Sequence, residues 1–484
     1  MDYIIDKKDK FKVLLTQPIW DIEDQFGRYS KGSGNNIFSY GLASIATLAE
    51  KEGFNVNICD TQVRNLSFND FEQFLTAGQY KIIGFPCYTA SVNRVKETAS
   101  LCRRILPGAV IVIGGIHPTL LPKETLLELK DADMVVVGEG EYTFLNILRY
   151  FKHGEPKLSE IPNIAYRIDG DIKINHISGT ISNLDDLPMP AYHLFPMKLY
   201  RPQFTIAKRL PTFGIFASRG CPYRCAFCSS NVIHGNKLRY RSIPKVITEI
   251  KYLQKTYGAR GITFQDSAFT SNRRWVKEFC HNVIKEKLNL HFMCYSRVDA
   301  VNEELLLLMK KAGFWGIGFG LESGNQKSLD LLQKGTTVGQ NIMAVKIAQK
   351  LGYYVQASYI LALPGEDRED VYNTLNFAKE TGTEIAFFNR PVPFPGTKLF
   401  EICKLQGGLK DNIIWDDYNM LLVDKLVYTN PNFSPKEIKD ILNYAIYSYY
   451  LNPRVIRKNL KHISSIDDIK KYFYGFLGVF GKKW

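Results

Sequence analysis

Short apolar runs and amphipathic stretches alternate along the first third of the chain. Each run has the length of a strand, and the stretches between them repeat apolar positions at helical spacing. Such alternation is typical of a parallel sheet covered by helices on both faces. We therefore predict an α/β fold that begins with a doubly wound, five-stranded parallel sheet. The predicted strands are residues 12–16, 55–59, 81–85, 109–113 and 133–137.

A second series of the same kind begins near residue 213. Helical stretches again separate the apolar runs, so the strands are expected to lie parallel. Six strand–helix units are fewer than the eight of a complete barrel, and we predict a partial (βα)6 TIM-like barrel. Its strands are predicted at residues 213–217, 261–264, 291–295, 315–319, 355–360 and 384–388.

The remaining segments predict a connector and a helical end. Residues 155–204 contain a small hairpin, with strands at 164–168 and 172–174. Ser434 to Glu437 form a capping box with a proline at the first helical position, which predicts a helix start. We predict four segments, namely a first domain (1–154), the connector (155–204), the barrel (205–405) and a helical C-terminal region (406–484).

Three cysteines lie within eight residues, directly after the first predicted barrel strand. Cys221, Cys225 and Cys228 offer three thiolates, whereas a closed zinc site takes four ligands. Three thiolates suit a four-iron cluster that keeps one iron open. The alternative is a zinc knuckle with His234 as the fourth ligand, in an RNA-binding or scaffold protein.

Small and polar residues gather where four strands of the first sheet end. Ligands on sheets of this kind bind beyond the carboxyl ends of the strands. Glycines there let the backbone approach a bulky ligand closely. The four loops at residues 16–18, 86–91, 114–119 and 138–141 therefore predict a binding site.

The spacing Cys-x3-Cys-x-Phe-Cys resembles that of radical S-adenosylmethionine (SAM) enzymes. Further matches follow in the family's order at residues 239–242, 264–270, 296–299, 318–324, 363–366 and 393–397. The resemblance implies a [4Fe-4S] cluster on the three cysteines, with Phe227 against the adenine of SAM. A salt bridge of Arg297 with Asp299 or Glu322 is the alternative to SAM contact, and Asp266 alternatively caps a helix. The SAM-binding residues implied are Phe227, Gln265, Arg297, Glu322, Ser358 and Pro395.

The first domain resembles the cobalamin-binding domain that precedes the barrel in many radical SAM enzymes. Residues 38–43, 52–54, 114–119 and 137–141 carry this resemblance. The Asp-x-His-x-x-Gly motif that supplies a lower cobalt ligand in methionine-synthase-like proteins is absent, which implies base-off cobalamin without a protein histidine. The alternative is a domain that keeps this fold without cobalamin. The cobalamin-binding residues implied are Thr16, Gln17, Pro18, Tyr88, Thr89, Ser91, Gly114, Gly115, His117, Gly138, Glu139, Gly140 and Glu141.

Together the two resemblances imply a reaction. Reductive cleavage of SAM would generate a 5′-deoxyadenosyl radical, and cobalamin would take part in methylating an unactivated carbon of a small molecule or lipid. The alternative keeps SAM and the cluster in a cyclase or oxidoreductase, where cobalamin is missing or serves electron transfer. In either case an external donor such as flavodoxin or ferredoxin is implied as a partner.

Charge and the distribution of apolar residues limit the kinds of partner and the location that we expect. The 484 residues carry a formal charge of +14, but no RNA-binding motif accompanies it, so we expect no nucleic acid. No apolar run approaches the roughly 18 residues that span a bilayer, and no signal-peptide pattern opens the chain, so we expect a cytoplasmic protein. Aromatic residues at 472–480 lie between lysines, a pattern that suits either a packed terminal helix or peripheral membrane contact by the tail.

Overall fold

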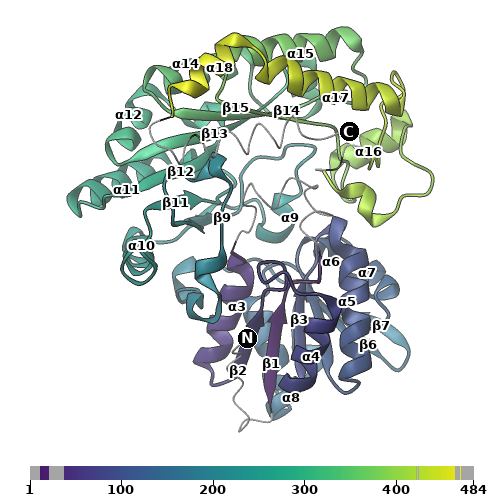
Figure 1. Ribbon diagram of the computed structural model, residues 1–484. Helices are drawn as coiled ribbons and strands as arrows, with labels where there is room; N and C mark the ends of the chain where they lie inside the picture. Colours follow the sequence, from purple (N-terminus) through teal and green to yellow (C-terminus); the bar gives the residue numbers. More distant parts are fainter. Residues whose placement is uncertain (1–10, 21–37, 421, 423–424, 464–468, 470–484) are drawn as a thin grey trace. The chain divides into compact units, whose positions relative to one another are not determined.

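The computed structural model describes residues 11–20, 38–420, 422, 425–463 and 469. Within them the chain forms two compact units (Figure 1). The first unit holds residues 11–20, 38–200 and 229–237, and the second holds residues 201–228 and the chain from 238 onward. The predicted tail contact at 472–480 lies outside the described residues.

The first unit is built on a seven-stranded sheet of order β2-β1-β3-β4-β5-β6-β7. Its first five strands are parallel, as predicted. The order reverses between β1 and β3, and such a switch point is where doubly wound sheets bind ligands. The hairpin β6–β7, predicted as part of the connector, pairs antiparallel with β5 and covers that edge of the sheet. The strands are β1 (Lys12–Thr16), β2 (Asn55–Cys59), β3 (Ile82–Pro86), β4 (Val110–Gly114), β5 (Met134–Val136), β6 (Ile164–Ile168) and β7 (Asp171–Ile174).

Helices cover this sheet. Helix α3 packs beside α8, and α4 packs beside α5. Continuous apolar runs bury the strands, and Leu14, Ile83 and Ile111 are fully inaccessible to solvent. The helices are α3 (Tyr40–Lys51), α4 (Phe68–Gly78), α5 (Val92–Ile105), α6 (Ile116–Leu120), α7 (Pro122–Glu128), α8 (Glu141–His153) and α9 (Ser230–His234).

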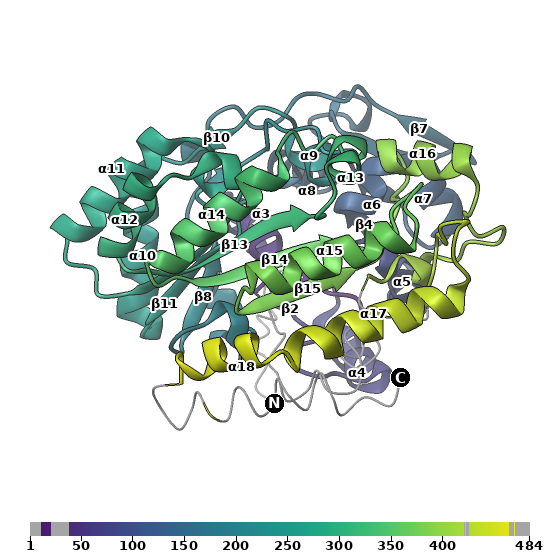
Figure 2. The same ribbon diagram turned by 90° about the horizontal axis from the view of Figure 1, so that it is seen from above.

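The second unit is a six-stranded, all-parallel sheet of order β15-β14-β13-β12-β11-β8. Because β8 and β15 remain edges, it is the partial barrel predicted. Figure 2 shows α14 and α15 running along one side of the strands. The strands are β8 (Thr212–Ile215), β11 (Gly261–Phe264), β12 (His291–Ser296), β13 (Phe314–Glu322), β14 (Tyr354–Ile360) and β15 (Ile385–Asn389). The helices include α10 (Ile243–Tyr257), α11 (Arg273–Lys285), α12 (Glu303–Lys311), α13 (Gln326–Leu331), α14 (Val338–Lys350) and α15 (Arg368–Thr381).

Stacked phenylalanines fill the space between β11 and the helix that follows it. The ring centroids of Phe264 and Phe269 lie 4.3 Å apart, and Phe279 meets Phe264 edge-on at 5.4 Å. All three side chains are fully buried, and each such burial stabilises the fold by about 2 kcal/mol. This core holds the end of β11 in place, and β11 leads directly into the site.

After the barrel strands the described chain forms helices α16 (Lys398–Gln406), α17 (Pro435–Tyr450) and α18 (Pro453–Leu460). The predicted capping box is confirmed, since the Glu437 amide donates to Ser434 Oγ at 3.2 Å. Ile438 and Leu442 of α17 pack against Val371 and Leu375 of α15. Within the described part of the chain, no helix combines the length and apolar character needed to cross a bilayer.

Candidate functional site

The chain that enters the cysteine loop is fixed to the end of β11. Asp266 accepts the amide of Ala217 at 3.1 Å and the hydroxyl of Ser218. Burial raises the pKa of this carboxyl to about 6. The suggestion that Asp266 caps a helix is wrong, because Asn272 is the residue that caps α11. Asp266 instead anchors the segment immediately before Cys221.

The cysteine loop is held by backbone bonds on both sides. The amide of Ala226 donates to the carbonyl of Leu332, and its carbonyl accepts from the amide of Leu399, both at 2.8 Å. Cys221 and Cys225 are half-buried, whereas Cys228 is exposed. Burial raises the pKa of the Cys221 and Cys225 thiols, and nearby cations partly offset this. The loop thus presents three thiols from a fixed backbone.

The donor set fits a cluster better than a single ion. Among the described residues, no three His, Cys, Asp or Glu side chains meet closely enough to hold one metal ion. His234, the fourth ligand of the zinc alternative, instead contacts Glu139 at 2.8 Å between Nδ1 and Oε1. In a four-iron cluster each thiolate binds a different iron, so three separated cysteines on one fixed loop suit it.

Arg297 follows β12 and faces the cysteine loop. Its Nε and NH2 donate to the two carboxylate oxygens of Asp299, at 3.0 and 2.8 Å. Its NH1 lies 3.8 Å from Cys225 Sγ, and its Cζ lies 3.7 Å from the ring centroid of Tyr223. The structure thus contains the predicted alternative, a salt bridge to Asp299, and adds a contact with a cysteine that sequence reasoning missed.

Glu322 ends β13 in a strained conformation. Its φ of +62° is unusual for a residue other than glycine, and the β13–β14 register shifts between Gly320 and Glu322. The carboxylate forms an ion pair with Lys334 Nζ at 2.7 Å, and both side chains are more than nine-tenths buried. A side chain at Gly320 would overlap both charged groups. Lys334 gave no sequence signal, because nothing in its neighbourhood distinguishes it from other lysines.

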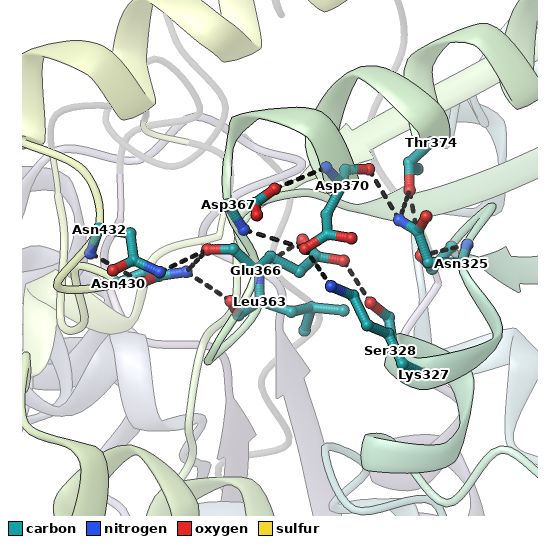
Figure 3. A network of polar contacts seen from close by, with 11 residues as sticks. Asn325, Lys327, Ser328, Leu363, Glu366, Asp367, Asp370, Thr374, Asn430 and Asn432 are labelled. Carbon is teal, nitrogen blue, oxygen red and sulfur yellow. Dashed lines mark hydrogen bonds and ion pairs between the residues drawn. The ribbon is translucent and has the colours of Figure 1, made fainter.

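Phe227 rests on an apolar shelf. Leu332, Ile360 and Leu363 form this shelf, and Lys334 Nζ lies 5.7 Å from the Phe227 ring centroid. The loop that carries Leu363 is fixed by polar contacts (Figure 3). Glu366 accepts the Leu363 amide at 2.9 Å and Ser328 Oγ at 2.5 Å, and burial raises its pKa to about 7. Asn430 Nδ2 donates to the Leu363 carbonyl at 2.6 Å.

The other predicted SAM residues lie on neighbouring strands. Gln265, Arg297 and Glu322 follow or end β11, β12 and β13, so the structure brings them to one edge of the sheet. The Gln265 side chain lies over Gly214 of β8. Ser358 lies inside β14, opposite Gly320, and Pro395 is half-buried in the loop before α16. We call the cysteine loop (218–228) and these strand ends the second rim.

The carboxyl ends of the first sheet form a rim built from backbone. We call its loops, residues 16–18, 86–91, 114–119 and 138–141, the first rim. Gly115 has a φ of +106°, and a side chain there would lie 2.8 Å from the carbonyl oxygen of Cys87. The Cys87 amide donates to the Gly114 carbonyl at 2.7 Å. Only glycine fits this close approach, so the two loops form a narrow cradle.

Most polar side chains behind the cradle form hydrogen bonds within the first unit or are buried in it. Thr16 Oγ1 donates to the Cys59 carbonyl at 2.7 Å. His117 is fully buried, and burial lowers its pKa to about 4, so its ring is neutral. Glu139 accepts the Ile181 amide at 2.7 Å, and Glu141 accepts Ser44 Oγ at 3.1 Å.

The loop that follows β3 offers groups to a ligand. Tyr88 is 57% exposed, while Ser91 Oγ turns back to accept the Tyr88 amide at 2.9 Å. Thr89 Oγ1 is buried and has no hydrogen-bond partner among the described residues. An unsatisfied hydroxyl beside a glycine cradle, at the switch point of the sheet, fits a bulky ligand with polar substituents such as cobalamin.

The remaining predicted first-rim residues lie in the same loops. The Gln17 amide donates to the Cys59 carbonyl at 3.4 Å, and the Pro18 carbonyl accepts Thr61 Oγ1 at 2.9 Å. The Gly138 amide donates to Thr119 Oγ1 at 2.9 Å, and Gly140 immediately precedes α8. The structure therefore brings all four predicted loops to one edge of the sheet.

The second unit is a partial barrel with a thiol loop suited to an open cluster. The first unit is a doubly wound sheet whose rim suits a corrinoid. Together these features define the class of radical SAM enzymes with a cobalamin-binding domain. Comparison with known proteins agrees. The family model of the B12 binding domain matches residues 32–148, and that of the radical SAM superfamily matches residues 215–378. The chain belongs to the cobalamin-dependent radical SAM methyltransferase family, whose cofactors are a [4Fe-4S] cluster, SAM and cobalamin.

Similar proteins include two relatives and one solved structure. An uncharacterized methyltransferase of Pyrococcus horikoshii is 32% identical over 91% of this chain and 93% of its own length. An anaerobic magnesium-protoporphyrin IX monomethyl ester cyclase of Rubrivivax gelatinosus is 28% identical over 74% of this chain and 65% of its own length. The methyltransferase TsrM of Kitasatospora setae, solved with cobalamin and a [4Fe-4S] cluster, shares the fold. Its TM-score is 0.69 at 18% identity, over 98% of this chain and 95% of that one.

Proposed function

We propose that this chain transfers a methyl group to an unactivated carbon of a small molecule or lipid, with the cluster held by Cys221, Cys225 and Cys228. The observation that carries the proposal is the fixed loop of three cysteines beside the buried pair of Glu322 and Lys334 and the partly exposed pair of Arg297 and Asp299. When bound, the cluster supplies the electron that cleaves SAM to a 5′-deoxyadenosyl radical, and cobalamin supplies the methyl group. The chain's own residues position these groups and exclude water.

For SAM, we propose that Phe227 lies against the adenine ring and that Glu322 accepts from a polar hydrogen of SAM. The Glu322–Lys334 pair is buried, so the carboxylate keeps a fixed position without being solvated. The strained φ of Glu322 supports a functional constraint at this residue. We propose that Gln265, Arg297, Ser358 and Pro395 complete the site.

For cobalamin, we propose that residues 1–154 form the binding domain and that the first-rim residues named above contact the cofactor. His117 is fully buried within the unit, which supports cobalamin that takes no protein histidine on cobalt. Residues 155–204, 205–405 and 406–484 are proposed as connector, catalytic barrel and helical region.

We further propose an external one-electron donor such as flavodoxin or ferredoxin as partner, because the cluster must be reduced before each cleavage of SAM. The substrate is proposed to be a small molecule or a lipid, and for a lipid the aromatic stretch 472–480 is proposed to contact the membrane surface.

A second candidate reaction is oxidative ring closure. The cyclase relative favours it, because its sequence aligns with 74% of this chain at 28% identity. Both reactions begin with hydrogen abstraction from an unactivated carbon, so the second rim would serve either. They differ in the fate of the substrate radical, which receives a methyl group in one and forms a ring in the other.

Anaerobic turnover of candidate substrates tests the proposal. The reconstituted protein is incubated with methyl-labelled SAM, hydroxocobalamin, a chemical reductant and extracts of the native cell, and products are identified by mass spectrometry. We expect 5′-deoxyadenosine and a product enlarged by one methyl group, with label transferred from methyl-labelled SAM. A product that has lost hydrogen and gained no label supports the cyclase. Absence of 5′-deoxyadenosine from iron-loaded protein contradicts both.

A further inference from the structure

We propose that Arg297 raises the reduction potential of the cluster through Cys225, and so makes it easier for an external donor to reduce. This inference rests on the proposed cluster at Cys221, Cys225 and Cys228. It assigns Arg297 a positioning and electrostatic role toward the cluster that is separate from contact with SAM.

The guanidinium of Arg297 is oriented by two independent restraints. Asp299 takes the edge formed by Nε and NH2, which leaves NH1 directed at Cys225 Sγ at 3.8 Å. The face of the guanidinium lies over the ring of Tyr223, with 3.7 Å between Cζ and the ring centroid. A fork that binds a carboxylate and a plane that stacks on an aromatic ring are features of arginine that lysine cannot reproduce.

Tyr223 belongs to the cysteine loop itself, two residues before Cys225. The stacking therefore ties the cation to the loop that holds the cluster, while Asp299 ties it to the end of β12. The Arg297 side chain is only 7% exposed, so solvent screens its interaction with the sulfur weakly. Because the Arg297 guanidinium is held on two sides and shielded from water, its electrostatic effect on Cys225 Sγ is constant.

The direction of the effect follows from charge. Reduction adds one negative charge to a cluster whose thiolates are already anionic, so a nearby N–H donor and cation stabilise the reduced form more than the oxidised form. Asp299 opposes this effect, but it binds the far edge of the guanidinium and its side chain is 25% exposed. Lys334, a further buried cation near the loop, has its Nζ engaged by Glu322. The net influence on Cys225 is therefore positive.

Redox titration of the full-length protein tests this inference. Wild type, Arg297→Gln, Arg297→Lys and Tyr223→Leu are reconstituted with iron and sulfide, their iron contents are measured, and the cluster is titrated without SAM while electron paramagnetic resonance is recorded. The matched control is Arg368→Gln. Arg368 also lies over an aromatic ring, that of Phe433, and pairs with a carboxylate, that of Glu437, but it belongs to α15.

We expect Arg297→Gln to lower the equilibrium constant for reduction about tenfold, which is a midpoint shift of about −59 mV for one electron. Arg297→Lys and Tyr223→Leu should show smaller shifts of the same sign, and Arg368→Gln none. An unchanged midpoint in Arg297→Gln at full iron content overturns the inference. If that variant does not load iron, unchanged midpoints in both Arg297→Lys and Tyr223→Leu overturn it. Wild type that takes up no iron would instead refute the proposed function, and this is measured before any potential.

Discussion

The two rims differ in the chemical groups that form their close contacts. In the first rim the close contacts are backbone to backbone, with Gly115 against Cys87, and the carboxylates of Glu139 and Glu141 are used by neighbouring protein groups. In the second rim charged side chains dominate, with Arg297 bound to Asp299 and Lys334 bound to Glu322. Cobalamin is a large, mostly neutral ring system, and its binding depends on space and shape. An anionic cluster and the sulfonium of SAM are instead stabilised by charged groups held in fixed positions.

This difference predicts that the two rims fail independently and in different ways. The first rim is sensitive to volume, because an added side chain blocks the approach of the loops. The second rim is sensitive to charge and to loss of a ligand, because its groups are buried in pairs. The four experiments below test that separation, from the largest expected effect to the smallest.

Replacing Cys225 with alanine should abolish cleavage of SAM. The remaining two thiolates cannot hold a stable open cluster, so iron content and 5′-deoxyadenosine formation should both fall to background. Corrinoid binding by the first rim should be unchanged, which is measured by the visible absorbance of bound cobalamin. Cys403→Ala, which removes a buried thiol of α16, is the control. Cleavage of SAM at the wild-type rate would refute the cluster ligands.

Replacing Gly115 with valine should give the opposite pattern. The backbone φ of +106° disfavours any side chain, and the new Cβ would collide with the Cys87 carbonyl. We expect cobalamin affinity to fall at least tenfold while iron content stays at the wild-type level. Gly108→Val is the matched control, because a Cβ at Gly108 meets nothing within 4 Å. Equal cobalamin affinity in Gly115→Val would show that the cradle does not serve cobalamin.

The sequence predicted the parallel strands of both sheets, in their order along the chain, and the loops of each rim. Predicted and observed strands agree within a few residues, because continuous apolar runs mark strands that helices bury on both faces. The rim loops were also predictable, since they directly follow those strands. Contacts between residues that are distant in the chain were not predictable. Lys334 meets Glu322 and Tyr223 meets Arg297 only after folding, and no local pattern marks either residue.

The same limit applies to Asp266 and to the hairpin β6–β7. Asp266 follows a strand and looks like a cap, but its carboxylate is used by residues almost fifty positions earlier. The hairpin was predicted from its turn, whereas its pairing with β5 depends on an open sheet edge that the local sequence does not show. Patterns of apolar residues thus predict elements, and tertiary contacts decide how polar groups are used.

Replacing Glu322 with glutamine tests charge in the second rim. Lys334 would remain buried without its counterion, so the free energy of unfolding should fall by about 4 kcal/mol. Peptide-resolved hydrogen exchange should show the loss in residues 314–334, with the first unit unaffected. Lys350→Gln, which breaks the exposed pair with Glu303, should change exchange little. A loss no greater than in that control would mean that the Glu322–Lys334 pair contributes nothing to the rim.

The smallest effect is a pH dependence that differs in sign between the units. Burial raises the pKa of Glu366 from 4.5 to about 7, so the native state keeps a proton that the unfolded state releases. Its contribution to stability is therefore present below about pH 4.5 and is lost as the pH rises to about 7, by about 2 kcal/mol between pH 5 and 7. Burial lowers the pKa of His117 from 6.5 to about 4, so the first unit should lose stability as the pH falls through that range.

Glu366→Gln separates these two contributions. Glutamine has the shape of the protonated carboxyl and retains a partner for Ser328 and for the Leu363 amide, so it should stay folded. Hydrogen exchange at pH 5 and pH 7 should show that protection of residues 325–366 falls with rising pH in the wild type but not in Glu366→Gln. Protection in the first unit should be the same in both proteins and should fall at low pH. Equal pH profiles for residues 325–366 would show that Glu366 is ionised in the folded protein, and the polar network beneath Phe227 would then be a charged one, like the pairs of Glu322 and Arg297.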